Sequence, residues 1–346
     1  MPYDLRQDFL LGPLPTEDGG KRLGPVILRS KIGQGGMGIV YAGDHLERGH
    51  TVAVKCLFTS WADQDPSYVK RFQREVRIAE ALSHPHMVEV HEAGESHGIH
   101  YLVMELLKGL TLGKTVRRGG PLSAIHAVPI IRDVAAALAA AHASEIVHRD
   151  VKPDNVFITE SGTAKLMDLG LAKASRAIDS FATGSGVVLG SLPFMPPEQH
   201  RSLAEVGPAG DVFSLGTTLW YALTGAHPPR DQRLPDLPAG VADRNLTTII
   251  SRATEPEAAR RHDHAGDLAA ALDIWLSEAP RIDAGPGLAA RVAAQANAAM
   301  QAAADDSDDF LESFPSGSPS GEPRLPSRPP PLPPGAIPPP SSAGSS

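Results

Sequence analysis

Cysteine and long apolar runs are both nearly absent from this chain. Its 346 residues include a single cysteine, Cys56, which excludes an internal disulfide framework and is typical of a reducing compartment. No stretch approaches the ~18 consecutive apolar residues that cross a membrane as a helix. The N-terminus lacks a basic segment followed by an apolar run, so no signal peptide is expected. These absences predict a cytoplasmic protein, anchored to a membrane only if a transmembrane segment follows residue 346.

Positive charge is also in short supply. The 32 lysines and arginines are outnumbered by 40 aspartates and glutamates, which gives a formal net charge of −8. Because binding to a phosphate backbone needs a basic face, this balance argues against nucleic acid as a bulk partner. The length allows one large domain with appendages.

Two parts with different apolar periodicity make up most of the chain. The first has short alternating or continuous apolar runs, which predict strands, and one amphipathic helix over residues 68–82. The second is dominated by apolar helical patterns and contains one short hairpin, so the fold class is α+β. The expected strands are 26–32, 39–44, 51–58, 87–92, 99–105, 156–159 and 164–167, and the later helices are 124–144, 209–224 and 265–278.

The two ends of the chain lack such patterns. Residues 1–23 are rich in proline, glycine and charge, and we expect a loose leader. Residues 279–304 are dominated by alanine, which predicts a helical linker. Residues 305–346 begin with an acidic patch and continue with mostly proline, serine and glycine, so their composition predicts a disordered tail. The stretch 324–334 fits either a polyproline-II ligand for aromatic-grooved domains or a stiff spacer.

The most informative feature is a polar segment, HRDVKPDN at residues 148–155, followed by Asp168. Two four-residue strands and a tight turn separate its last residue, Asn155, from Asp168. Folding these strands as a hairpin is expected to bring Asn155 opposite Asp168, and an amide beside a carboxylate provides hard oxygen ligands for Mg²⁺. Asp150 then lies within reach as a candidate base. This arrangement favours a substrate rich in negative charge.

A glycine string, G-x-G-x-x-G, lies near the start of the first part. It consists of Gly33, Gly35 and Gly38. A dinucleotide-binding turn would need a helix directly after the glycines, whereas residues 39–42 are β-branched and aromatic and favour a strand. The string is therefore expected to form a hairpin between strands, either one whose amides close over phosphates or an ordinary flexible turn.

The order of these motifs resembles that in eukaryotic-type protein kinases, and their sequences are similar to those of bacterial Hanks-type serine/threonine kinases. HRDVKPDN and the DLG that begins at Asp168 resemble the catalytic loop and the metal motif of that family. The resemblance covers residues 24–278 and implies a bilobal kinase fold, with a β-rich N-lobe over 24–105 and a helical C-lobe over 106–278. Further matching segments are GQGGMGIV at 33–40, VAVK at 52–55, PPE at 196–198 and DVFSLG at 211–216.

The resemblance implies an ATP site between the lobes. Adenine would lie against Val40 and Ala53, and backbone groups after the gatekeeper residue Met104 would supply its polar contacts. The implied ATP-binding residues are Ile32, Gly33, Gln34, Gly35, Gly36, Met37, Gly38, Val40, Ala53, Lys55, Met104, Glu105 and Leu107.

The same resemblance implies the catalytic roles. Asp150 would be the base for the substrate hydroxyl, and Lys152 would lie near the γ-phosphate. Lys55 would contact the α- and β-phosphates and be held by Glu75, with Glu80 as the alternative partner. A lysine at position 152 is the serine/threonine pattern, so serine and threonine are the expected acceptors.

Metal binding and one departure from the family follow from the DLG motif. Asn155 and Asp168 would hold two Mg²⁺ (or Mn²⁺) ions that bridge the phosphates. Leu169 stands where the family usually has phenylalanine. Leucine is apolar and only somewhat smaller, so we expect activity to survive this change.

Regulation and structural support complete the implied residue set. Arg149 would pair with a phosphate on the segment 171–195, with Thr183 as the preferred autophosphorylation site. Ser191 is expected to bond Asp150 and Lys152 near the substrate pocket. The implied structural residues are Asp211 in the central helix and Glu198, which would pair with Arg261 or, less well, Arg260.

We therefore expect an Mg-ATP-dependent serine/threonine protein kinase that phosphorylates protein substrates. Self-association could support autophosphorylation in trans, and the proline-rich tail could dock partners. An ATP-binding pseudokinase that acts as a scaffold is the alternative.

Overall fold

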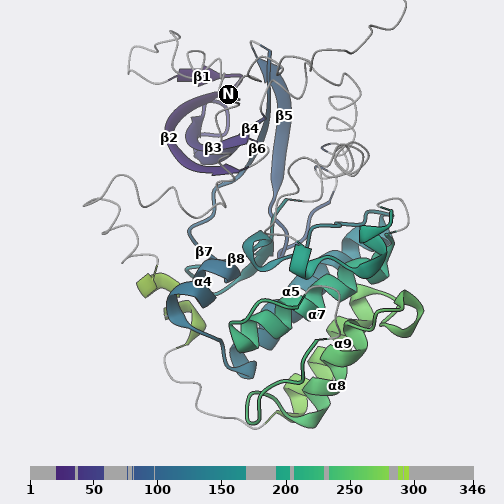
Figure 1. Ribbon diagram of the computed structural model, residues 1–346. Coiled ribbons are helices and arrows are strands. Elements are labelled where there is room, and N and C mark those ends of the chain that lie inside the picture. Colours follow the sequence, from purple (N-terminus) through teal and green to yellow (C-terminus); the bar gives the residue numbers. More distant parts are fainter. Residues whose placement is uncertain are drawn as a thin grey trace, which may run out of the picture. The chain divides into compact units, whose positions relative to one another are not determined.

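The computed structural model describes residues 21–35, 38–57, 76, 80, 82–96, 98–168, 192–202, 206–229, 234–279, 287–290 and 292–295. The first part is an antiparallel six-stranded sheet in the order β1-β2-β3-β4-β6-β5 (Figure 1). Its strands are β1 Lys21–Leu23, β2 Val26–Gly35, β3 Gly38–His45, β4 Thr51–Leu57, β5 Val90–Ser96 and β6 Ile99–Glu105.

The sheet is held together by its own small apolar core. Leu23, Val26, Val52, Val54 and Val103 are completely buried. The β-branched side chains among them pack well on a pleated surface, which is why these short sequences form strands. The expected N-lobe strands are present, and β6 has the predicted bounds.

The second part is mainly helical. Its helices are α4 Leu112–Gly119, α5 Ala124–Ala143, α7 Pro208–Thr224, α8 Arg244–Ala253 and α9 Ala265–Glu278. A three-stranded sheet in the order β7-β8-β9 accompanies them, formed by Gly109–Thr111, Val156–Thr159 and Ala164–Leu166. Short 3₁₀ turns are η1 Pro153–Asn155, η2 Leu192–Phe194, η3 Pro197–His200 and η5 Ala258–Arg260.

Helices α5 and α7 are apolar on most of their surface because they are buried. Within the described part of the chain, α5 is the one helix long and apolar enough to cross a membrane. It packs against α7 and α9, and the residues facing them belong to the core of the helical part. Burial against other helices therefore explains its composition.

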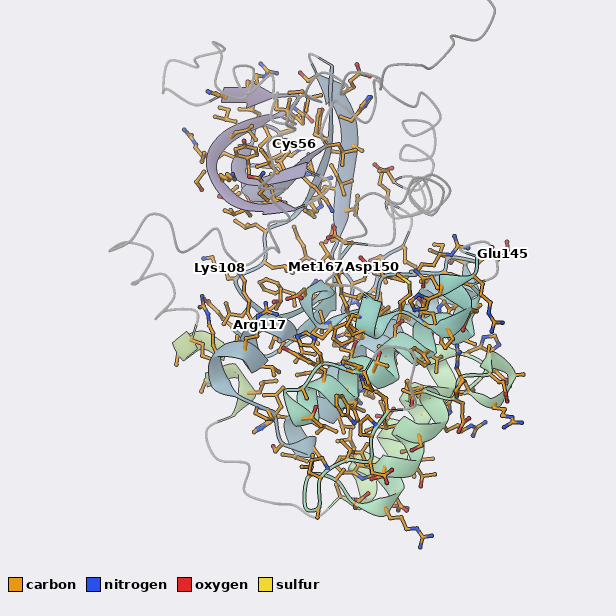
Figure 2. The ribbon with its side chains drawn as sticks, viewed as in Figure 1. Cys56, Lys108, Arg117, Glu145, Asp150 and Met167 are labelled. Atoms are coloured by element: carbon orange, nitrogen blue, oxygen red, sulfur yellow. The ribbon has the colours of Figure 1, made fainter. Side chains whose placement is uncertain are left out.

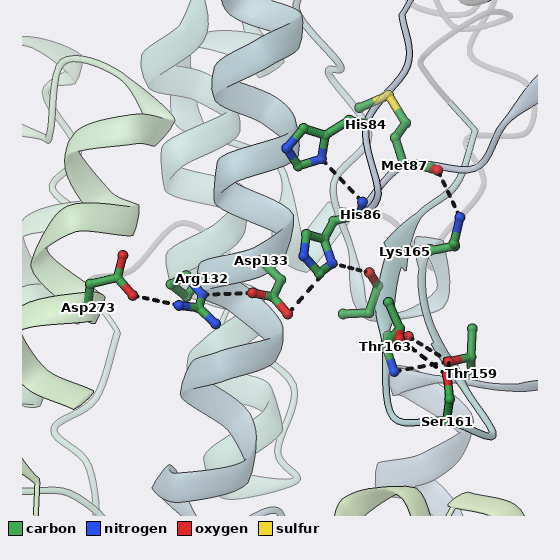
Figure 3. A network of polar contacts seen from close by, with 11 residues as sticks. His84, His86, Met87, Arg132, Asp133, Thr159, Ser161, Thr163, Lys165 and Asp273 are labelled. Atoms are coloured by element: carbon green, nitrogen blue, oxygen red, sulfur yellow. Dashed lines mark hydrogen bonds and ion pairs between the residues drawn. The ribbon is translucent and has the colours of Figure 1, made fainter. Parts of the chain in front are cut away.

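A polar network joins the loop before β5 to two helices (Figure 3). His86 Nδ1 donates to the carbonyl of Ala164 at 2.9 Å and lies 3.6 Å from the carboxylate of Asp133 on α5. Arg132 bonds both Asp133, at 2.7 Å, and Asp273 of α9, at 2.6 Å. The loop is thus tied to the helical part through side chains as well as through the backbone bond from Val88 to Leu166.

Several elements differ from the sequence prediction. Strand β5 begins at Val90 and not at Met87, which instead bridges Leu166, and it continues to Ser96 as the polar edge strand of its sheet. Strand β1 lies in the segment predicted as a loose leader. Strands β1 and β7 and helices α4 and α8 were not predicted, because each is too short to show a clear period.

The helix predicted over residues 68–82 lies largely outside the described residues. Val76 and Glu80 are helical, and Leu82 is not.

The alanine-rich segment after α9 is more than a linker. Residues 288–290 and 292–295 are helical, as predicted. Val292 is completely buried and belongs to the core of the helical part, and Leu288 packs against that core. A Cβ placed on Gly162, in the turn between β8 and β9, would lie 3.2 Å from the Cβ of Ala289. This part of the segment therefore packs on the β8–β9 turn.

Arg261 forms the best-connected ion pair among the described residues. Its guanidinium, which is fully buried, donates to both carboxylate oxygens of Glu198, at 2.7 and 2.8 Å. It also donates to three backbone carbonyls, of Glu255, Pro256 and Ala209, and lies 4.9 Å above the ring of Phe213. The neighbouring Arg260 pairs instead with Glu257 on the surface. Arg261 thus fixes the 196–200 turn against α7.

The contrast between the buried Arg261 and the exposed Arg260 predicts different effects of their substitution on stability. Arg261→Ala should lower the free energy of unfolding by about 3–5 kcal/mol, because it leaves the Glu198 carboxylate without its partner. Arg260→Ala removes an exposed pair and should cost about 1 kcal/mol or less. Chemical denaturation of the full chain measures both, and equal effects would contradict the assignment.

Candidate active site

The carboxylate of Asp211 lies beneath the HRDVKPDN segment. Asp211 is completely buried on α7, where a charge is costly unless it is hydrogen-bonded. Its Oδ1 accepts the backbone N–H of Arg149 at 2.8 Å, and its Oδ2 accepts the N–H of His148 at 2.8 Å and Nε2–H of His142 at 2.9 Å. This one side chain fixes two successive peptide groups.

These bonds hold Arg149 in an unusual conformation. Its φ is +61°, a region that non-glycine residues rarely adopt. The N–H is held by Asp211, and the carbonyl accepts a hydrogen bond from Gln199 Nε2 at 3.0 Å. The strained backbone is therefore fixed from both sides, which places the next residue, Asp150, in one position.

His148 connects this segment to the strand before Asp168. The ring is completely buried, Nε2–H donates to the carbonyl of Met167 at 2.9 Å, and Nδ1 accepts the N–H of Asp150 at 3.2 Å. Figure 2 labels Met167 and Asp150 next to each other. Each ring nitrogen thus has one defined role. The histidine links the base candidate to the end of the β8–β9 hairpin.

Asp150, Lys152 and Asn155 form one polar group. Asn155 Nδ2 donates to the backbone carbonyl of Asp150 at 2.8 Å and to its Oδ2 at 3.2 Å. Lys152 Nζ lies 3.3 Å from the same Oδ2. The carboxylate of Asp150 is mostly shielded, with 12% of the side chain exposed. A mostly buried carboxylate beside a lysine is suited to accept a proton from a hydroxyl group.

The register of the β8–β9 hairpin differs by one residue from the prediction. Val156 pairs with Leu166, and the carbonyl of Asn155 accepts the N–H of Met167 at 2.8 Å. Asn155 is therefore opposite Met167 rather than Asp168, because the N–H of Thr159 bonds the carbonyl of Thr163, so that the turn holds residues 160–162 and not 160–163. Asp168 follows with a φ of +53°, which redirects the chain.

Lys55 reaches this hairpin from the other sheet. It lies on β4, opposite Val40 on β3, and its Nζ is 2.5 Å from Asp168 Oδ1. Burial opposes ionisation of Asp168, but the Lys55 ammonium outweighs burial and holds the pKa of that carboxyl below its ordinary value. The carboxylate is therefore ionised at neutral pH.

The glycine string forms a strand hairpin, as predicted. Gly35 pairs with Gly38, and β3 follows directly, so the helix that a dinucleotide-binding turn requires is missing from residues 38–45. A Cβ on Gly38 would lie 1.9 Å from the carbonyl oxygen of Cys56, so only glycine allows β3 to lie this close to β4. Ile32, Gly33 and Gln34 lie on β2 of the same hairpin.

The expected adenine contacts lie on neighbouring strands. The register places Ala53 opposite Met104, and Glu105 is opposite Val52. The N–H of Glu105 already donates to the carbonyl of Glu89 at 3.0 Å, so it is engaged within the protein. Leu107 follows β6 in the segment that leads to β7.

The Glu105 side chain makes a contact that sequence reasoning missed. It accepts Lys165 Nζ of β9 at 2.5 Å and the N–H of Glu89 at 2.8 Å. Glu105 is thereby joined to the hairpin that carries Asp168. No sequence pattern links Glu105 to Lys165, since they are 60 residues apart.

A divalent metal fits the oxygen donors that are present. Asn155 Nδ2 is engaged by Asp150, which turns Oδ1 to the opposite side, and Asp168 is ionised. Among the described residues no group of three or more His, Cys, Asp or Glu is placed to hold a metal. Phosphate oxygens would therefore have to complete the shell of Mg²⁺ or Mn²⁺.

Some expected site residues cannot be placed. They lie outside the described residues, and they are Gly36, Met37, Glu75, Leu169, Thr183 and Ser191.

The chain matches the family model described as protein kinase domain over residues 27–274. The chain belongs to the protein kinase family. It is 37% identical over 273 residues to the serine/threonine-protein kinase PknH of Mycobacterium bovis, which covers 75% of this chain and 45% of that protein. It is 34% identical over 273 residues to PknE of the same organism, covering 75% of this chain and 48% of that protein.

Solved structures give the same family. The PknI kinase domain of Mycobacterium tuberculosis is 27% identical with a TM-score of 0.60, over 74% of this chain and 98% of that chain. The expected resemblance to bacterial Hanks-type kinases and the expected kinase fold are thus confirmed. This kinase chain spans about half the length of the curated relatives it matches.

Cys56 lies next to Lys55 in this kinase, but it is not placed for chemistry. It is buried, and burial raises the pKa of its thiol to about 12. Since the thiolate is the nucleophile, iodoacetamide at pH 8 should leave Cys56 unmodified in the folded chain. Mass spectrometry should find complete alkylation in urea. Alkylation of the folded chain at the unfolded rate would contradict its burial.

Proposed function

We propose that this chain is a Mg²⁺- and ATP-dependent serine/threonine protein kinase that phosphorylates proteins. One observation carries the proposal: Lys55 of the β-rich part reaches Asp168 of the hairpin, beside the Asp150–Asn155 group. A cation, a base and two oxygen ligands thus converge, and Mg²⁺ on those ligands would balance the negative charge that a phosphate-rich substrate brings.

The residues suggest a direct route for phosphoryl transfer. A substrate hydroxyl would attack the γ-phosphorus, the bond to the β-phosphate oxygen would break, and the hydroxyl proton would pass to Asp150. Lys152 Nζ, which lies 3.3 Å from Asp150 Oδ2, would stabilise the negative charge on the γ-phosphoryl oxygens. Mg²⁺ held by Asp168 and Asn155 would neutralise charge on the phosphates. When ATP is bound, its α- and β-phosphates would compete with Asp168 for the Lys55 ammonium, and Lys55 would bind them.

Serine and threonine are the proposed acceptors. Lys152 follows the family's serine/threonine pattern, and the curated relatives PknH and PknE are named as serine/threonine-protein kinases. Glu75 remains the proposed partner of Lys55.

Regulation by phosphorylation is part of the proposal. Arg149 Nε is buried, and within the described residues it has no hydrogen-bond partner. A phosphate on the segment 171–195 would accept charge-assisted hydrogen bonds from the Arg149 guanidinium. We propose Thr183 as the acceptor, modified in trans by a second copy, and Ser191 as a contact of Asp150.

Two further parts of the proposal concern binding partners and cellular location. The proline-rich stretch 324–334 would either dock an aromatic-grooved domain or act as a spacer. Cytoplasmic catalysis fits the use of ATP and the single cysteine.

Asp150→Asn tests the proposal. An amide cannot accept the hydroxyl proton, so the rate of labelled phosphate transfer from Mg-ATP should fall about 10²–10⁴-fold while ATP still binds. The exposed Asp236→Asn is the matched control and should keep full activity.

Mass spectrometry of the wild-type chain should locate phosphate on serine or threonine in segment 171–195. Thr183→Ala should lower activity towards an added protein substrate. Absence of transfer by the wild-type chain, with ATP bound, would overturn the kinase proposal and favour a pseudokinase scaffold.

A further inference from the structure

Arg117 joins helix α4 to the turn that carries Asn155. Its Nη2 donates to Asp154 Oδ1 at 2.9 Å, and Asp154 directly precedes Asn155 in η1 (Arg117 is labelled in Figure 2). A Cβ placed on Gly113 would lie 2.4 Å from Asp154 Oδ1 and 3.0 Å from Arg117 Nη1. The glycine at position 113 therefore lets α4 lie directly against this ion pair.

The stability of the fold gains little from this arrangement. Because 45% of the Arg117 side chain and 37% of the Asp154 side chain are exposed, water screens much of their attraction. Gly113 lies inside α4, where glycine is less favourable than alanine. What the contact does maintain is the position of η1 against α4.

Asn155 is placed by the backbone of η1. The residue is 6% exposed, and its N–H donates to the carbonyl of Lys152 at 2.9 Å. Its Nδ2 donates to the backbone carbonyl and to Oδ2 of Asp150, at 2.8 and 3.2 Å. Its own carbonyl accepts the N–H of Met167 at 2.8 Å. A shift of η1 would therefore move the proposed metal ligand and disturb the carboxylate of the proposed base together.

Arg117 also interacts with Tyr221, which α7 places in the interior. Burial raises the pKa of the Tyr221 hydroxyl, and the charge of Arg117 opposes this rise. Burial likewise disfavours the charge of Arg117, but Asp154 and Tyr221 together outweigh burial and raise the pKa of the guanidinium. The Tyr221 ring packs edge-on against Phe194 of η2, with centroids 5.8 Å apart, and Phe194 lines a small cavity with Asp150. Arg117 thus links η1 to the packing beside the proposed base.

We propose that Arg117 is a positioning residue for phosphoryl transfer, which holds η1 through Asp154 and thereby keeps Asn155 in place to bind Mg²⁺. The proposal rests on the proposed kinase function, since Asn155 has this role only if the chain binds ATP with a metal. Arg117 acts through Asp154 and not on the reacting atoms. Since a misplacement of about 1 Å can lower a rate about 10²-fold, a small shift of η1 is enough to matter.

Mn²⁺ binding in the presence of ATP tests the position of Asn155 without catalysis. Electron paramagnetic resonance of free Mn²⁺, titrated with the full chain and ATP, gives the dissociation constant of the metal. Arg117→Gln should raise this constant roughly threefold to tenfold, less than the ~10–100-fold that follows loss of a group bonded to a metal ligand. Arg118→Gln, which changes an exposed residue of the same helix, is the matched control and should bind Mn²⁺ as the wild-type chain does. Equal Mn²⁺ affinity of Arg117→Gln and wild type would overturn the proposal.

Gly113→Ala separates the position of η1 from the stability of the fold. The added methyl group must displace the Asp154 carboxylate, whereas alanine favours the helix. This variant should keep or raise the midpoint of chemical denaturation and still raise the Mn²⁺ dissociation constant. A merely structural role of the contact would make the two quantities change together, and wild-type Mn²⁺ affinity in this variant would contradict the proposal.

A double-mutant cycle tests the route through Asp154. If Arg117 acts through Asp154, the chain with both Arg117→Gln and Asp154→Ala should bind Mn²⁺ about as well as the weaker single variant. Effects that multiply would show that the two residues act independently, and would overturn this route.

Phosphate transfer by the wild-type chain keeps this proposal distinct from the kinase proposal. If the wild type binds Mn²⁺ and ATP but transfers no phosphate, the kinase proposal fails, and the Mn²⁺ affinity of Arg117→Gln still decides the positioning role. If the wild type transfers phosphate and Arg117→Gln binds Mn²⁺ equally well, the positioning role alone fails. A wild-type chain that binds no Mn²⁺ with ATP would overturn both.

Discussion

The buried carboxylate of Asp211 is the interaction on which the site depends. It lies in the apolar interior of the helical part, so its charge is stable only because three N–H groups donate to it. Two of those groups belong to His148 and Arg149, and their bonds hold the left-handed backbone that orients Asp150. The hydrogen bonds that offset the cost of burying this charge therefore also fix the loop that carries the proposed base.

Further hydrogen bonds and one ion pair connect this loop, through the β8–β9 hairpin, to the other sheet. His148 bonds Met167, whose N–H bonds Asn155, and the chain then turns at Asp168. Lys55 reaches Asp168 from β4, and the ion pair of Glu105 with Lys165 joins the end of β6 to the same hairpin. The packing of Val292 and Ala289 extends the domain past residue 274, where the family match ends.

Much of the fold and site could be predicted because their signals are local. Alternating apolar residues gave most strands, long apolar periods gave α5, α7 and α9, and the motif order gave the kinase family. Short elements such as β1 and α4 could not be predicted, since they are shorter than the stretch of sequence over which a period can be recognised. The hairpin register was wrong by one residue because the turn between β8 and β9 is one residue shorter than the sequence suggested. Pairs such as Arg117–Asp154 and Glu105–Lys165 depend on the tertiary structure alone.

Replacing Asp211 with asparagine tests the central claim most directly. The amide keeps the size of the side chain but turns one acceptor into a donor that faces the N–H of His148 or Arg149. We predict a chain that remains folded, by circular dichroism and denaturation, with a rate of phosphate transfer lower by roughly 100-fold, because Asp150 loses its position. A folded Asp211→Asn chain with unchanged transfer would contradict the account.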